Sequence, residues 1–237
     1  HTGHTAVRGN VGMELEGQFP IPDSAFTIAE LFKKAGYATG DFGKWGLGPV
    51  GSSGDPIKQG FDEFYGYNCQ TLAHDYFPDH LWKNNLMVKL PNTINNQNVY
   101  AGDLIQQNAL DFISKHQKEP FFVYLSYTLP HAGLQLPLGD KYFEAYKMAF
   151  KEEAIPIKPW DGKGYQPQAY PKAAYAAMVQ KLDDYVGQVL LKLKELGIDK
   201  NTMVVFTSDN GPHKEGGNIP EFFNSSGGFR GIKRDLY

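Results

Sequence analysis

The fold class is decided by the stretch FFVYLSY at residues 121–127. This continuous apolar run follows Pro120, and such runs are typical of a central strand in a parallel sheet. A helix is expected just before it, over about residues 99–116. Its buried face is expected to include Ala101, Leu104, Ala109, Leu110 and Ile113. Helix and strand together form one unit of an α/β protein.

Two further units have the same alternation. Thr27 and Glu30 form a capping-box pair ahead of a helix over residues 28–35, Gly36 ends it, and a short strand is expected at 37–42. Near the C-terminal end, one helical face carries Leu182, Val186, Val189, Leu193 and Leu196, and a buried strand is expected at residues 203–207. The sequence therefore predicts an α/β fold with a mostly parallel central sheet flanked by helices. Residues 48–98 and 132–172 are expected to be long loop excursions, a second small domain there being the less favoured interpretation.

The amino-acid composition argues against several classes of protein. The chain has 237 residues and a formal net charge of −3, which argues against a nucleic-acid partner. A hydrophobic share of 41 % argues against disorder, and no apolar run approaches the roughly 18 residues of a membrane span. The single cysteine, Cys69, excludes an internal disulfide framework and a CxxC metal knuckle.

Polar residues follow each expected strand. Lys44 follows the first, His131 the second, and Asp209 with Asn210 the third. If the strands are parallel, their carboxyl ends bring these residues to one edge of the sheet, although each residue taken alone is more often a surface, loop or turn residue. A cation, an imidazole and two oxygen donors suit an oxyanion beside a divalent metal, calcium or magnesium rather than zinc.

Several motifs carry a family resemblance. GKWGLG at residues 43–48 resembles a sulfatase signature, and TSDNGPH at 207–213 resembles the sulfatase metal motif. PFF at 120–122 through Pro130-His131, GFDEFYG at 60–66, and the opening HTGHT with Arg8 are also similar to sulfatase stretches. The resemblance covers essentially the whole chain, in the order of the sulfatase family, within the alkaline phosphatase superfamily.

The resemblance implies the central part of one arylsulfatase-type catalytic domain, incomplete at both ends, that hydrolyses a sulfate ester. It implies a formylglycine nucleophile, expected upstream of His1, made from the Cys or Ser of a Cys/Ser-x-Pro-x-Arg motif. If the roles of the family's motif residues are carried over, Asp209 and Asn210 are ligands of calcium, and magnesium is the less favoured metal. Lys44 and Lys233 contact the sulfate, and His131 contacts it or donates a proton to the leaving oxygen. His74 and His213 are expected to bind substrate.

Two departures bear on the nucleophile. Cys69 is followed by QTLA, without the Pro and Arg of the modified motif, so it is expected to be a small buried residue. Gly46 stands where the family usually has a histidine, and His74 is a candidate to compensate. Because the nucleophile motif is absent, residues 1–237 alone are expected to be inactive.

Two alternatives stay open. One is a phosphate-ester hydrolase of the same superfamily, although Asn210 directly after Asp209 favours the single-calcium sulfatase form. The other is a non-catalytic segment or homologue that binds sulfated ligands. The expected partner is a sulfated small molecule or glycan, and the family resemblance implies an exported protein, periplasmic or extracellular.

Overall fold

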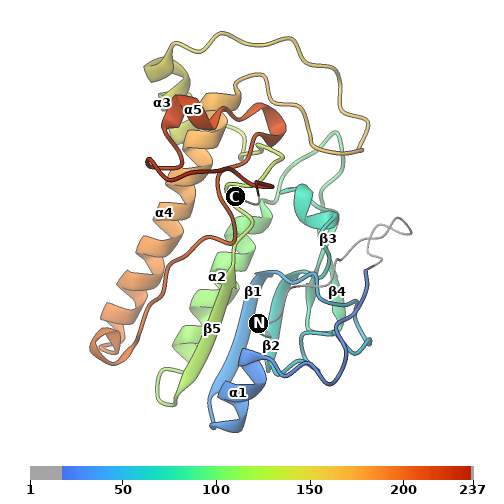
Figure 1. The fold of residues 1–237 in the computed structure, drawn as a ribbon, viewed down its shortest axis with the longest axis vertical. Coiled ribbons are helices and arrows are strands. Elements are labelled where there is room, and N and C mark those ends of the chain that lie inside the picture. Colours follow the sequence, from blue (N-terminus) through green and yellow to red (C-terminus); the bar gives the residue numbers. More distant parts are fainter. Residues whose placement is uncertain (1–17, 236–237) are drawn as a thin grey trace.

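A five-stranded sheet forms the centre of the described part of the chain, residues 18–235 of this computed structural model (Figure 1). The strand order is β4-β3-β2-β1-β5. β1 pairs in parallel with β2 and β5, while β3 and β4 add an antiparallel hairpin. The predicted α/β class with a central sheet flanked by helices is confirmed, and the sheet is mixed, with two parallel and two antiparallel strand pairs. The strands are β1 Ala38–Lys44, β2 Glu63–Tyr67, β3 His80–Lys83, β4 Leu86–Lys89 and β5 Phe121–Ser126.

The first helix, α1 (Ile28–Lys34), begins at the predicted capping box. The Thr27 hydroxyl accepts from the Glu30 backbone N–H at 3.2 Å, and the Glu30 carboxylate accepts from the Thr27 N–H at 2.7 Å. These bonds satisfy two N–H groups that a helix start leaves without partners. Gly36 follows the helix with φ +84°, a conformation that favours glycine, and the chain turns into β1.

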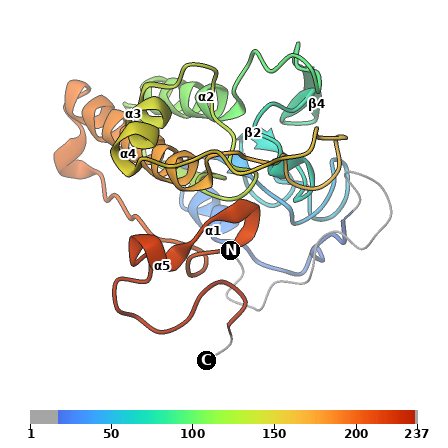
Figure 2. The same cartoon turned by 90° about the horizontal axis from the view of Figure 1, so that it is seen from above.

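Helices cover both faces of the sheet (Figures 1 and 2). Neighbouring residues of β2 show this, because successive side chains of a strand point to opposite faces. Phe64 packs with Ala29 of α1, whereas Tyr65 packs with Phe112 of α2 (Ala101–Lys115). Behind α2 lies the long helix α4 (Pro171–Glu195), whose Tyr185 carbonyl accepts from the Gln106 side chain at 3.0 Å.

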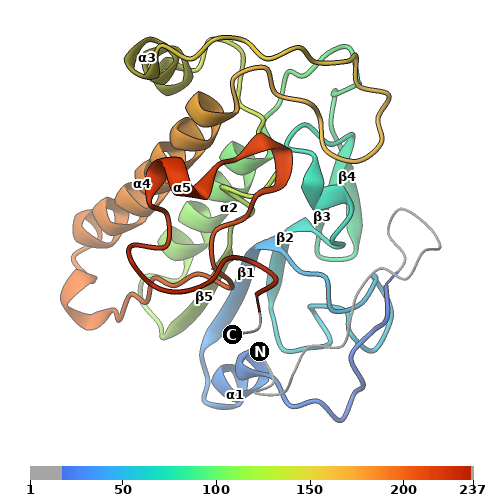
Figure 3. The same cartoon turned by 45° about the horizontal axis from the view of Figure 1, so that its top comes forward.

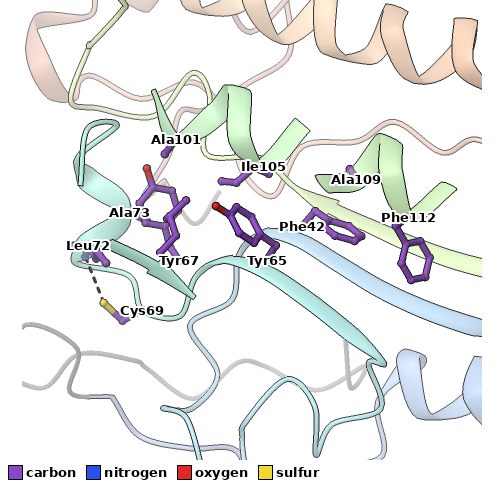
Figure 4. Close-up of a cluster of buried hydrophobic side chains, with 11 residues drawn as sticks. Phe42, Tyr65, Tyr67, Cys69, Leu72, Ala73, Ala101, Ile105, Ala109 and Phe112 are labelled. Carbon is purple, nitrogen blue, oxygen red and sulfur yellow. Dashed lines mark hydrogen bonds between the residues drawn. The ribbon is translucent and has the colours of Figure 1, made fainter. Parts of the chain in front are cut away.

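The α2 side of the sheet holds the larger part of the core (Figure 4). Phe42 and Phe112 meet there with ring centroids 5.5 Å apart. Cys69 lies at the end of this cluster, fully buried, and its sulfur accepts from the Leu72 N–H at 3.3 Å. The cysteine is therefore packed as a small core residue, as the sequence predicts.

Both long excursions contain regular structure. Residues 48–98 hold β2, β3, β4 and the short 3-10 helix η1 (Leu72–His74), and the turn of the β3–β4 hairpin places Asn84 at φ +52°. Residues 132–172 hold α3 (Lys141–Phe150), whose Tyr142 hydroxyl donates to Asp184 of α4 at 2.6 Å. The excursions thus extend the sheet and cover α4.

The predicted buried strand at residues 203–207 is wrong for this structure. After α4 and η2 (Asp199–Asn201) the chain is irregular there, and Met203, Val205 and Phe206 are 88 %, 76 % and 71 % exposed. The physical reason is the lack of a partner, because β5 pairs only with β1 among residues 18–235. For the same reason the predicted central strand at 121–127 is the edge strand β5.

The remaining chain crosses the end of the sheet. It contains η3 (Glu215–Gly217) and α5 (Pro220–Phe223), and its last described residues lie over the carboxyl ends of β1 and β5 (Figures 1 and 3). No described helix is both long and apolar enough to cross a membrane. The opening motif with Arg8 lies outside the described residues.

Candidate active site

His131 is the centre of a polar cluster beyond the carboxyl end of β5. Its Nδ1 lies 2.5 Å from the Ala132 carbonyl oxygen, and its Nε2 lies 2.8 Å from the Lys233 ammonium nitrogen. A carbonyl can only accept, so Nδ1 carries the proton and Nε2 accepts from Lys233. Burial, opposed by the Ala132 bond and aided by Lys233 and Lys44, lowers the pKa of His131 to about 4. The imidazole is therefore neutral near pH 7 in the absence of an anion.

Lys44 and Lys233 bring two cations to the same place from opposite ends of the chain. Lys44 is the last residue of β1, and Lys233 is fixed by a backbone bond from its N–H to the Pro212 carbonyl at 2.8 Å. Burial lowers the pKa of Lys44; the Asp209 carboxylate raises it, and Lys233 lowers it further. The positive charges of Lys44 and Lys233 repel one another, and an oxyanion between them would remove the repulsion.

Two more histidines pack around His131. The His74 ring, at the end of η1, stacks on His131 with centroids 5.3 Å apart and planes 3° apart. Burial and the nearby Lys44 and Lys233 lower the pKa of His74. The His213 ring lies 5.6 Å from His131, and its Nε2 lies 2.9 Å from the Pro130 carbonyl oxygen. Of the two residues predicted to bind substrate, His74 is the more exposed. His213 is only 6 % exposed, and its contact with the Pro130 carbonyl joins it to the loop after β5.

Asp209 and Asn210 lie in an exposed bend after residues 203–207. The charge of Asp209 acts on both Lys44 and Tyr124, which places it at the same edge of the sheet. Within residues 18–235 no three His, Cys, Asp or Glu side chains come together as a metal site. The oxygen donors of this pair fit calcium chemically, but they supply only part of the six to eight oxygens that calcium takes.

The space expected for the family histidine is filled by Gln70. Gly46 has φ +82°, and a Cβ built on it would lie 2.8 Å from the Gln70 amide nitrogen. A histidine at position 46 would therefore be strained by the positive φ, and the end of the Gln70 side chain would have to move to admit it. Gln70 was not singled out from the sequence, because nothing in its neighbourhood predicts contact with the glycine-rich loop.

Tyr165 is a second residue that the sequence does not reveal. Its ring meets His74 edge-on at 5.0 Å and His131 at 5.8 Å. It comes from the excursion 132–172, in a stretch of Gly, Pro and Gln that has no periodicity. Beside this tyrosine, the structure brings together six of the residues expected at the site: Lys44, His74, His131, Asp209, His213 and Lys233. The backbone carbonyl of Asn210 accepts from the Ser208 hydroxyl at 2.8 Å.

Known proteins share both the sequence pattern and the fold. The sequence model of the sulfatase family matches residues 2–236. N-acetylgalactosamine-6-sulfatase of Rattus norvegicus is 31 % identical over 91 % of this chain and 39 % of its own length. Arylsulfatase of Klebsiella aerogenes is 28 % identical over 91 % of this chain and 53 % of its own length.

A solved structure has the same arrangement of elements. Ps i-CgsB in complex with k-i-k-neocarrahexaose superposes with a TM-score of 0.62 and 28 % identity, covering 86 % of this chain and 46 % of that one. The chain thus spans about half or less of the length of these relatives. The match over nearly every residue, together with the cluster around His131, leads to one conclusion: the chain belongs to the sulfatase family.

Proposed function

We propose that the full-length protein hydrolyses a sulfate ester and holds the sulfate between Lys44 and Lys233. The observation that carries the proposal is the 2.8 Å contact between Lys233 and His131 at the sheet edge where β1 ends in Lys44. Paired cations and an imidazole in a partly buried site suit a sulfuryl group, whose oxygens gain charge as the ester bond breaks. The names of the relatives support the same reaction.

The electrostatics of the cluster suggest how His131 works. Without substrate, burial depresses the pKa of His131 most, and Lys233 and Lys44 depress it further. A bound sulfate offsets these charges, so substrate binding raises the pKa of His131 and lets Nε2 take up a proton. The protonated imidazole then donates to the leaving oxygen, while the two lysines neutralise the sulfuryl oxygens.

The nucleophile and the metal belong to the same proposal. We infer a formylglycine upstream of residue 1, since the described residues offer no activated nucleophile in the expected motif. Calcium, when bound, would add positive charge beside the sulfate, and Asp209 with Asn210 would supply carboxylate and amide oxygens to it. Residues 1–237 alone are then expected to show no turnover.

A sulfated glycan is the proposed substrate class. The structural relative Ps i-CgsB was solved with k-i-k-neocarrahexaose, and the relative from Rattus norvegicus is named for a sulfated amino sugar. We also propose a periplasmic or extracellular location, which the family resemblance implies.

The test compares an aryl sulfate with the matching aryl phosphate on the full-length protein. We expect faster sulfate turnover, and we expect Lys233→Ala to reduce kcat by about 10²–10³-fold, the usual effect of removing one charge-stabilising donor. Lys200→Ala, an exposed lysine on η2, is the matched control and should change neither rate. Faster phosphate turnover would favour the phosphate-ester alternative. Tight sulfate binding without any turnover would favour a non-catalytic binder.

A further inference from the structure

A second cavity lies beside the sulfate site and shares one wall with it. It has a volume of about 270 Å³ and is bordered by His74, whose ring stacks on His131. The other borders are the loop after η1, the loop after β4 and residues 160–164. The roles proposed above use only His74 from this lining.

The charge of this cavity is opposite to that of the sulfate site. Its lining includes the carboxyl groups of Asp75 and Asp79 and contains no lysine or arginine. The Asp79 side chain is 75 % exposed and lies 2.7 Å from His80. A second sulfate would meet carboxylates here without a cation to compensate it, so the lining disfavours anions.

Trp160 gives the cavity an aromatic surface. Its indole nitrogen donates to the Lys163 carbonyl at 3.0 Å, which holds the ring within its own loop. Within residues 18–235, no aromatic ring or cationic group is found packed on the indole. The Trp160 side chain is partly exposed, and beside polar lining residues such as Thr93 and Gln97 it suits a ligand with both C–H faces and hydroxyl groups.

The cavity and the sulfate site are tied together by residues 160–166. Trp160 borders the cavity, and five residues later Tyr165 meets His74 and His131 edge-on. The next residue, Gln166, accepts through its side-chain oxygen from Gln97 at 2.6 Å and from Gln135 at 2.5 Å. One segment thus fixes the distance between the indole and the histidine pair.

We propose that this cavity is a saccharide subsite that takes an uncharged sugar unit next to the sulfated unit, with the sugar packed on Trp160. The inference rests on the proposed function, because it places the sulfated unit between the lysines. The subsite favours glycans whose neighbouring unit is unsulfated and discriminates against those with a sulfate on both units.

The first test uses the full-length protein with two disaccharide series, one based on galactose and one on N-acetylgalactosamine. Trp160→Ala is expected to raise KM for a monosulfated disaccharide about tenfold more than for an aryl sulfate, which has no second sugar. Trp160→Phe should recover most of the loss. Leu138→Ala, at a fully exposed position of the same excursion, is the matched control. Equal losses for both kinds of substrate, or no loss for either disaccharide series, would overturn the subsite.

The second test addresses charge. Wild-type protein is expected to prefer the monosulfated over the disulfated disaccharide, and Asp79→Lys should narrow that preference. A wild-type preference for the disulfated form would contradict the proposal.

Titration with unsulfated disaccharides separates the subsite from the proposed sulfate hydrolysis. If the wild type binds an unsulfated disaccharide and Trp160→Ala weakens this binding, the subsite is supported even if the protein hydrolyses no sulfate. If the wild type binds no disaccharide of either series, the subsite is contradicted, while the proposed sulfate hydrolysis is not.

Discussion

At the residue scale, burial together with the Lys233–His131 contact keeps the His131 imidazole neutral. The Nδ1–H of His131 donates to the Ala132 carbonyl, so Nε2 must accept from Lys233. The sequence placed both residues in one site through the family resemblance. It could not show the direction of the hydrogen bond, which depends on a backbone carbonyl one residue away.

This arrangement makes a prediction for the histidine itself. In the substrate-free full-length protein, His131 should titrate with a pKa of about 4, well below the usual 6.5, and Lys233→Met should raise it. NMR of the imidazole C–H signals measures both values. Because the folded pKa is depressed, the contribution of His131 to stability is present above pH 6.5 and is lost as pH falls through about 4. A wild-type midpoint near 6.5 would show that burial and the two lysines do not depress the pKa of His131.

Gly46 and Gln70 show where residue-level resemblance stops. The glycine marks a departure from the family pattern that sequence comparison can see. Only the structure shows that the Gln70 amide fills the adjacent space, because the two residues are separated by β2 and the loops around it.

At the element scale, the local signals of the sequence were the reliable ones. The capping box, the glycine stop and the helical periodicity of α4 depend on residues within a few positions of one another. The prediction for residues 203–207 failed because a strand also needs a neighbour, and apolar composition does not supply one. The same missing neighbour leaves β5 at the sheet edge.

The start of α1 can be tested directly. Thr27→Ala should destabilise the protein by ~1 kcal/mol or somewhat more, since it removes the cap and also the hydroxyl that donates to the Gln59 carbonyl at 2.6 Å. Thr27→Ser keeps both bonds and should recover most of the loss. Urea unfolding of the full-length protein gives the three values. If alanine and serine variants lost the same stability, the hydrogen bonds would not be the cause.

At the scale of the whole molecule, the site is assembled from four distant parts of the chain. Lys44, His74, His131 and Lys233 span nearly 190 positions. Lys44 and His131 follow the parallel strands β1 and β5, so the strand pattern predicts that these two residues meet at one edge. The sequence placed His74 and Lys233 in the site through the family resemblance. Tyr165 was not predictable, because a loop without periodicity gives no information about where it crosses the sheet.

The stability of the whole protein should also depend on one buried carboxyl group. Asp41 in β1 is fully buried and its Oδ1 accepts from Ser126 at 2.9 Å, whereas its Oδ2 has no hydrogen-bond partner among residues 18–235. Burial, partly opposed by the Ser126 bond, raises the pKa of Asp41 to about 8. The folded state therefore holds a proton that the unfolded state releases, and stability should fall between about pH 4 and pH 8.

The variant Asp41→Asn removes this titration with little change in shape. It should flatten the dependence of the unfolding free energy on pH, and at pH 9 it should be more stable than the wild type. Urea midpoints between pH 5 and pH 9 provide the comparison. A wild-type curve as flat as that of the variant would mean that Asp41 ionises freely in the folded protein.

The burial of Cys69 has a practical consequence for spectroscopy. The chain contains one thiol, which is fully buried in the core between the sheet and α2. Maleimide dyes will therefore react with it slowly while the protein is folded. The variant Leu138→Cys, at a fully exposed position, would therefore offer the preferred attachment point within this chain.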